Sequence, residues 1–318
     1  MCTTVSHFLF YILNKQDLSK TLSEHCTFSF CGFTEWLSHV DFWHQLDGSL
    51  IGDHSEENVT SHLLCLNSEY SLKNSKSLVL RLALEVEEDG VDQYLDLIVR
   101  EKNVKTQKDP TFKIHLKVCL LQITGYRNLF ESVEELRKET FDSDKVEHEE
   151  MLLKLWDLLM PDTKLESRVT KQWGDIGFQG DDPKTDFRGM GMLGLTNLAF
   201  FSEHYTEEAR QVLSHANHPN LGYSYAIVGI NLTEMAYSLL KSGALKPHFY
   251  NTVSGRPELQ HFHQLYCYLA YQFDRFWVEE KPASIMEFNH YREKFHDQIK
   301  IQLLDPAVGL ILTGHWKK

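Results

Sequence analysis

A long succession of helical periods, interrupted once by a glycine-rich segment, most constrains the fold of this 318-residue chain. From Phe112 onward, apolar residues recur at spacings of three and four, as in helices that bury one face. The interruption covers residues 173–191 and reads WGDIGFQGDDPKTDFRGMG. Strand alternation bounded by hairpin turns is absent. The sequence therefore predicts an all-α protein with one loop that departs from helical structure.

Changes in pattern divide the chain into four regions. Residues 1–70 show no sustained period and give no structural prediction. Residues 71–140 are predicted to be a helical amino-terminal flank, with a charged linker at 101–110. Residues 141–305 are predicted to form a compact multi-helix domain on which the flank packs, and residues 306–318 a tail. We therefore expect a single compact multi-helix domain with this flank.

Individual helices follow from the same periodicity. Residues 112–124 are apolar nearly throughout, which predicts a central buried helix. Residues 190–201, 223–240 and 259–278 are also predicted to be helical. The S/T-x-x-E pattern of a capping box predicts helix starts at Ser132, Thr163 and Ser284, and residues 142–144 are predicted to cap the helix that follows them.

Charge and composition exclude some classes of function. Lys and Arg number 32 against 45 Asp and Glu, which gives a net charge of -13. Such a surface repels phosphates, so we expect no nucleic-acid partner. Hydrophobic residues make up 42% of the chain, an ordinary value for a globular protein. The balance instead suits a basic protein partner.

Nothing in the sequence has the spacing of a metal or cofactor site. The six cysteines are scattered, which favours a reducing compartment, and Cys119 is expected to be a buried apolar side chain. His215 and His218 lack an acidic residue nearby in the sequence, so we expect the histidines to be solvated or hydrogen-bonded rather than metal ligands. Residues 189–194 match G-x-G-x-x-G without the preceding strand that a dinucleotide site needs, which favours helix packing.

Membrane-spanning segments are not predicted. The apolar run at residues 8–13 is far shorter than the ~20 residues needed to cross a bilayer, and it does not resemble a signal peptide. Aromatic residues between 28 and 43 have two interpretations, a core position, which we favour, or contact with a membrane surface. A cytoplasmic location is expected.

Arg188 is the residue of the glycine-rich segment on which a functional interpretation depends. It lies just before the helix predicted for 190–201, where the helix dipole disfavours a cation by about 0.3–1 kcal/mol. Carboxylates of Asp181, Asp182 or Asp186 would offset that cost. The residues alone favour a structural arginine that holds the loop through a carboxylate, and leave open a functional arginine presented by the loop.

The segment 173–191 resembles the motif of the ELMO (engulfment and cell motility) domain. Further stretches agree with that family, among them CLLQITGYRNL, FDSD, HEEMLLKLW, LGYSYAIVGINLTEMAYSLL and IMEFN. Within that family, the chain resembles the small ELMO domain-containing proteins, and the resemblance covers residues 70–305. Residues 1–70 depart from the amino-terminal pattern of that group.

The resemblance implies a GTPase-activating protein for small GTPases of the ADP-ribosylation factor (ARF) and ARF-like family. In that family the proposed catalytic arginine finger belongs to the F-R-G step, which here is Arg188, and the large engulfment scaffolds lack it. The implied partner is a GTP-loaded ARF or ARF-like GTPase that holds GTP and Mg²⁺ itself, so the chain needs no cofactor. Peripheral association with intracellular membranes stays open. The alternative is a non-catalytic module that binds a small GTPase or an exchange-factor complex.

The remaining residues of the segment are assigned supporting roles. Its glycines are expected to allow close approach to a GTPase surface, and its aromatic residues, with Trp173, to anchor the loop. Thr185 and Asp186 are expected to cap a helix or orient Arg188, and Gln179 to stabilise the loop or pack rather than to position water. The loop and partner-contact candidates are Gly177, Phe178, Gln179, Asp182, Pro183, Thr185, Asp186, Phe187, Gly189 and Gly191. Gly180 is expected, like the other glycines, to allow close approach to the partner.

Overall fold

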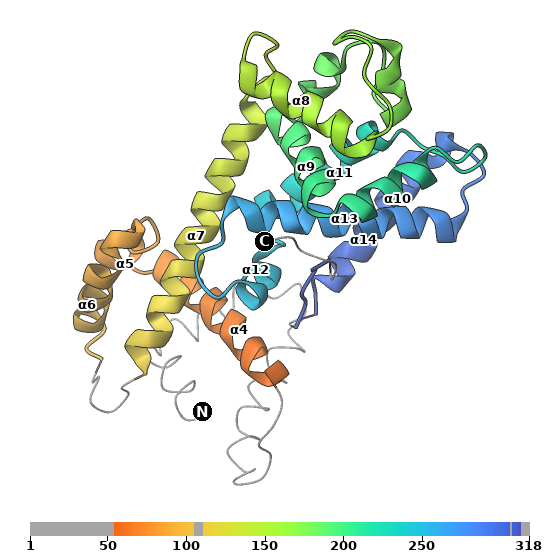
Figure 1. Ribbon diagram of the computed structural model, residues 1–318. Coiled ribbons are helices and arrows are strands. Elements are labelled where there is room, and N and C mark those ends of the chain that lie inside the picture. The colour runs from red at the N-terminus through yellow and green to blue at the C-terminus, as the bar shows by residue number, and fades with distance from the viewer. Residues whose placement is uncertain (1–53, 105–110, 306, 313–318) are drawn as a thin grey trace. The chain divides into compact units, whose positions relative to one another are not determined.

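The computed structural model describes residues 54–104, 111–305 and 307–312, and every regular element within them is an α-helix or a 3₁₀ helix, so the predicted all-α class is confirmed (Figure 1). The described residues divide into two compact units, one from those within 1–125 and 254–256, the other from those within 126–253 and 257–318. The domain boundaries expected from the sequence stay predictions. The α-helices are α4 (His54–Lys73), α5 (Leu78–Leu82), α6 (Val91–Glu101), α7 (Phe112–Lys138), α8 (Val146–Leu159), α9 (Gly191–His204), α10 (Thr206–Ala216), α11 (Tyr225–Ser242), α12 (Lys246–Thr252), α13 (Leu259–Glu280) and α14 (Phe288–Gln302).

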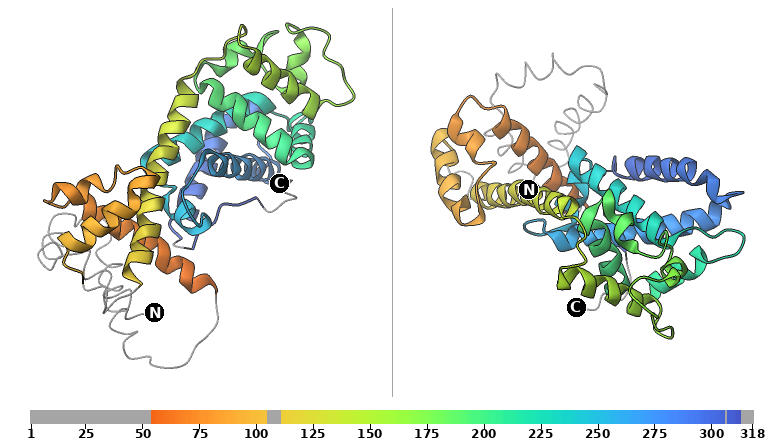
Figure 2. Two further views of the ribbon diagram at one scale, coloured as in Figure 1. Left: turned by 60° about the vertical axis from the view of Figure 1, so that its left-hand side comes forward. Right: turned by 90° about the horizontal axis from the view of Figure 1, so that it is seen from above.

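In the first unit, the short helix α5 packs between α4 and α6, and the first half of α7 completes the unit (Figure 2). Cys65 of α4 and Cys119 of α7 are buried free thiols whose sulfur atoms lie 3.3 Å apart. The Cys65 thiol donates to Gln122 Oε1 at 2.9 Å. The buried position expected for Cys119 is thus confirmed.

In the second unit, α9 is the central helix. It packs against α8, α10, α11 and α13 (Figures 1 and 2). Its residues Leu193, Leu195, Leu198 and Phe201 are all buried, as expected for a helix that is apolar on every side. This helix matters for function because the glycine-rich segment leads directly into its first turn.

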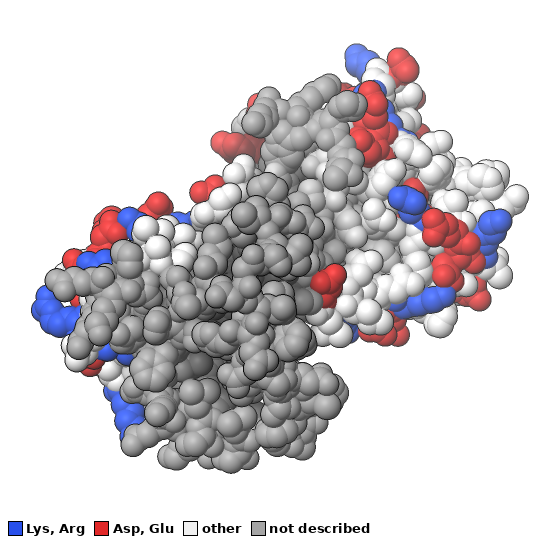
Figure 3. Space-filling model, turned by 90° about the horizontal axis from the view of Figure 1, so that it is seen from below, with Lys and Arg blue, Asp and Glu red and all other residues white. Residues whose placement is uncertain are grey.

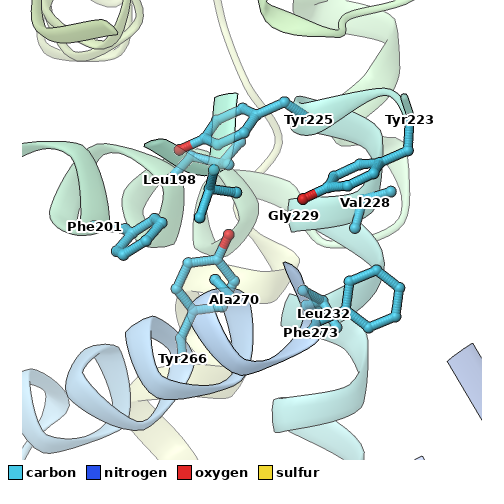
Figure 4. Close-up of a pocket in the computed structure, with 11 residues that line it drawn as sticks. Leu198, Phe201, Tyr223, Tyr225, Val228, Gly229, Leu232, Tyr266, Ala270 and Phe273 are labelled. Carbon is cyan, nitrogen blue, oxygen red and sulfur yellow. The ribbon is translucent and has the colours of Figure 1, made fainter. Parts of the chain in front are cut away.

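The interior around α9 is closely packed. A cavity of about 10 Å³ lies among α9, α11 and α13, and the side chains of Tyr225 and Tyr266 line it (Figure 4). That volume is at the lower limit for a single water molecule, so this region is core rather than a ligand site. Gly229 permits the close approach, because a Cβ there would lie 2.5 Å from Leu198 Cδ2 and 2.8 Å from the Tyr266 hydroxyl.

Several local predictions were wrong. Helix α7 is not buried all round, because Ile114 is 63% exposed. Ser132 lies inside α7, where S-x-x-E is an ordinary spacing on a helix surface. No helix begins at Thr163, which lies in the non-helical stretch after α8. Residues 142–144 do not cap α8, because the N-cap position of this helix is occupied by Lys145. The Asp142 carboxylate instead accepts from the Asp144 N–H in a local turn.

The predicted start at Ser284 is confirmed. Its hydroxyl accepts from the Met286 N–H at 3.1 Å, and the Glu287 carboxylate accepts from the Ala283 N–H at 2.9 Å. The helix that Ser284 caps is a short 3₁₀ turn, Ile285–Glu287, which runs into α14. The capping-box pattern therefore predicted the position of the helix start correctly, but it did not indicate that the first turn is a 3₁₀ helix.

The structure also bears on the predictions about surface charge and membrane-spanning segments. On the face drawn in Figure 3, acidic and basic side chains of the described residues lie interspersed. Among the described helices, none has both the length and the apolar character needed to cross a membrane. The apolar run at 8–13 and the aromatic residues between 28 and 43 lie outside the described residues.

His215 has an acidic partner that its sequence neighbourhood does not show. Its Nδ1 lies 2.7 Å from Oδ2 of Asp274 on α13, and the Tyr223 hydroxyl donates to Oδ1 of the same carboxylate at 2.7 Å. The hydrogen-bonded role expected for the histidines therefore holds at His215. No cluster of potential metal ligands occurs in the part of the chain that the structure describes.

Two buried histidines should make the second unit sensitive to acid. Burial lowers the pKa of His248 and of His263 to about 4, whereas an unfolded histidine titrates near 6.5. The unfolded chain therefore binds more protons between these values, so stability is complete above pH 6.5 and falls as the pH approaches 4. Each histidine should contribute a loss of roughly 3 kcal/mol across that window.

Urea unfolding at several pH values between 7.5 and 4.5 measures this loss. His263→Gln keeps a donor for Asn197 Oδ1, which His263 Nδ1 contacts at 2.6 Å, and should flatten the decline. An equally steep decline in this variant would show that His263 does not contribute.

Candidate functional site

The glycine-rich segment lies between α8 and α9. It includes most of one 3₁₀ helix, η2 (Lys171–Ile176), and all of a second, η3 (Pro183–Arg188). The Asp182 carboxylate accepts from the Lys184 N–H at 3.0 Å and so caps η3, with Pro183 in its first turn. The Thr170 N–H donates to Asp181 O at 2.9 Å, which joins the residues just before the segment to its middle. The segment is therefore an ordered loop.

Aromatic side chains fix this loop to the core. Trp173 is fully buried and packs edge-on against Trp156 of α8 and against Phe178, with ring centroids 5.5 Å and 5.9 Å apart. Phe178 in turn contacts Phe187 at 5.6 Å. The Trp173 indole N–H donates to Arg168 O at 2.9 Å. These contacts are what the expected anchoring role requires.

The glycines of the segment fall into two groups. A Cβ on Gly177 would lie 2.3 Å from Tyr225 N, and one on Gly191 would lie 2.4 Å from the carbonyl oxygens of Arg137 and Glu139. The space beside these two glycines is therefore filled by the protein's own backbone, which differs from the expected approach of a partner. Nothing lies within 4 Å of the corresponding positions at Gly174, Gly180 and Gly189, so these three leave open space.

Arg168 holds the loop through two carboxylates. Its Nε donates to Glu149 of α8, its Nη1 donates to Asp182 Oδ1 at 2.9 Å, and its guanidinium lies 5.7 Å from the centre of the Phe141 ring. The structural arginine expected in this region exists, but it is Arg168. Sequence reasoning missed it because Arg168 lies outside the glycine-rich segment, although Asp182 within the segment needed a cationic partner.

Replacing Arg168 by alanine should lower the free energy of unfolding by about 1–3 kcal/mol, because two partly buried carboxylates lose a charged donor. Hydrogen exchange at the Thr170 and Gln179 amides should become faster. The matched control is Lys154→Ala, which breaks the exposed ion pair with Glu203 and should cost about 0–1 kcal/mol. Equal effects of the two substitutions would contradict the tethering role of Arg168.

Arg188 is the last residue of η3, and its side chain is exposed. Its Nε donates to Thr185 O at 2.8 Å. Across the described residues, no carboxylate forms an ion pair with it, and its two terminal nitrogens make no hydrogen bond. The predicted carboxylate ion pair is therefore wrong, but an electrostatic offset from Asp186 is present: burial raises the pKa of that carboxyl, and the charge of Arg188 opposes the rise. One nitrogen is oriented by the backbone, and the rest of the guanidinium is available to a ligand.

The neighbours of Arg188 take roles that differ in detail from those expected. Thr185 orients Arg188, as expected, and does so through its carbonyl oxygen. Asp186 is not a helix cap: its Oδ2 accepts from the Gln179 N–H at 2.7 Å, and burial raises the pKa of this carboxyl. Gln179 contributes this backbone group to the loop, but its side chain is exposed and does not pack.

A sequence model of the ELMO/CED-12 family matches residues 131–292, which include the whole loop. The chain belongs to the ELMO/CED-12 family. Human ELMO domain-containing protein 2 is 64% identical over 244 residues, which cover 77% of this chain and 83% of the relative. Mouse ELMO domain-containing protein 1 is 52% identical over 259 residues, with 76% and 79% covered. No solved structure matches the chain.

A family member from a slime mould is also similar to this chain. ELMO domain-containing protein B of Dictyostelium discoideum is 37% identical over 241 residues, which cover 69% of this chain and 83% of the relative. The family resemblance inferred from the residues of the glycine-rich segment is confirmed by these matches. In this ELMO protein the segment is an ordered loop that exposes the guanidinium of Arg188 beside the first turn of α9.

Proposed function

We propose that this ELMO protein is a GTPase-activating protein for small GTPases of the ARF and ARF-like family, and that Arg188 is its catalytic arginine finger. The observation that carries the proposal is the exposed guanidinium, which is oriented through Nε and has its terminal nitrogens available. The loop that presents it is held by buried aromatic residues and by Arg168. A finger must be held in this way, because ordering it during the reaction would cost conformational entropy.

The chemistry of GTP hydrolysis matches what such a group supplies. Negative charge in the transition state is spread over the γ-phosphate oxygens and the leaving oxygen. A guanidinium stays charged at every physiological pH and offers a planar fork of donors to phosphate oxygens. In this proposal the partner GTPase holds GTP and Mg²⁺, and Arg188 enters the site in trans.

A second candidate is a non-catalytic module that binds a small GTPase or an exchange-factor complex. The hydrogen bond from Arg188 Nε to Thr185 O favours it, because an arginine already held by the backbone also serves to shape a binding surface. Cytoplasmic location and peripheral association with intracellular membranes accompany both candidates as predictions.

Single-turnover GTP hydrolysis separates the two candidates. Purified ARF and ARF-like GTPases are loaded with GTP and mixed with excess wild-type protein, and a Ras-type GTPase serves as the control for specificity. Activation predicts a faster release of phosphate from the ARF-family proteins than each gives alone. Binding to the GTP-loaded form without any acceleration would support the interaction module and contradict the proposed activity.

A further inference from the structure

Gln179 lies at an exposed tip of the loop, between two glycines with left-handed backbone. Gly177 has φ +85° and Gly180 has φ +74°. The side chain of the preceding residue, Phe178, is buried, and a Cβ on Gly180 would meet nothing within 4 Å. Anchoring of Phe178 leaves the Gln179 side chain directed to the surface, where its amide makes no hydrogen bond to any described residue.

Asp186 connects this tip to the short helix that carries Arg188. Its carboxylate accepts the Gln179 N–H at 2.7 Å, while Arg188 Nε donates to the carbonyl oxygen of Thr185, the residue before Asp186. Both attachments are made within η3. The loop therefore presents an amide and a guanidinium from one shared scaffold, which Asp186 and Thr185 hold together.

We propose that Gln179 is a second catalytic residue, whose side-chain amide orients the attacking water while Arg188 stabilises the developing charge. This inference rests on the proposed GTPase activation. The water oxygen bonds to the γ-phosphorus as the bond to the β–γ bridging oxygen breaks. GDP leaves with that electron pair, and the water proton passes to a phosphate oxygen, which gives GDP and inorganic phosphate. Gln179 holds the water in line and is itself unchanged.

An amide suits this role because it both accepts and donates hydrogen bonds. Its carbonyl oxygen accepts from the water, and its NH₂ group donates to a γ-phosphate oxygen. Arginine only donates, so Arg188 cannot orient the water in this way. In small GTPases a glutamine of the GTPase itself performs this task. An activator that supplies its own amide makes that glutamine dispensable.

The decisive experiment uses a GTP-loaded ARF-family GTPase whose own water-orienting glutamine is replaced by alanine. Single-turnover hydrolysis is measured with the wild-type protein, with Gln179→Ala and with Gln179→Glu. Wild type should still accelerate this GTPase, and both variants should lose about 10²-fold in rate, as expected when a reacting group is misplaced. Glutamate fails because it lacks the donor and repels the phosphate.

Matched measurements separate a catalytic from a structural effect. Gln211→Ala removes an exposed glutamine of α10 and should keep the wild-type rate. Both Gln179 variants should also keep the thermal stability of wild type, and Gln179→Ala should keep its affinity for the GTPase loaded with a non-hydrolysable GTP analogue.

Failure of the inference differs from failure of the proposed function. No acceleration of the unmodified GTPase by wild type would overturn both. Acceleration of the unmodified GTPase, with none of the glutamine-lacking one, would overturn only the role of Gln179. Full acceleration of the glutamine-lacking GTPase by Gln179→Ala would overturn it as well.

Discussion

Replacing Arg188 by alanine should reduce the single-turnover rate of GTP hydrolysis in the complex by about 10³ to 10⁵-fold, the effect of an arginine finger. Arg188→Lys should lose most of the same factor, because an ammonium group keeps the charge but lacks the planar fork of donors. Stopped-flow detection of phosphate release, with the protein in excess over the GTP-loaded GTPase, measures the rate constant.

Stability measurements decide whether such a loss is catalytic. The Arg188 side chain is exposed, and within the described ranges its one hydrogen bond is to Thr185 O, so its substitution should change the free energy of unfolding by no more than about 0.5 kcal/mol. Lys184→Ala removes another exposed cation of the same short helix and should keep the maximal rate. Folded Arg188 variants that activate fully would show that Arg188 only shapes the loop.

The helices could be predicted from the sequence because their apolar periods are long. Helices α9, α11 and α13 begin and end within a few residues of the predicted 190–201, 223–240 and 259–278. The start signals were less reliable, since a four-residue pattern such as the one at Ser132 also occurs inside helices. Such a pattern marks a helix start only when the residues before it are not already helical. The four residues of the pattern carry no information about that.

The candidate site was predicted in part. Period and composition located the loop, and the family resemblance supplied its reaction. Gln179 was named as a partner-contact candidate, and its side chain is exposed. The tether through Arg168 was not predicted, because its two carboxylate partners lie 19 and 14 residues away in the chain. Asp186 was assigned to Arg188 by proximity in the sequence, whereas in the fold its carboxylate is committed to the Gln179 N–H.

The second large effect is expected at Gly191, the first residue of α9. Its φ is +53°, and a Cβ there would lie 2.4 Å from two carbonyl oxygens at the end of α7. Gly191→Ala should therefore cost about 1–3 kcal/mol for the left-handed backbone. Crowding of the closely packed backbone should add about 1–3 kcal/mol. Chemical unfolding followed by circular dichroism measures the total.

Gly189→Ala is a closely matched control, because Gly189 lies two residues earlier and has φ -82° with nothing within 4 Å of a Cβ. Alanine at such a position should leave stability unchanged or raise it by about 0.4–1 kcal/mol. Equal stabilities of the two variants would contradict the close packing of α9 against α7. That packing matters for the proposed activity, because the Met192 N–H also donates to Glu139 O at 2.8 Å. The start of α9, and with it the position of Arg188, is thereby fixed to the residue that follows α7.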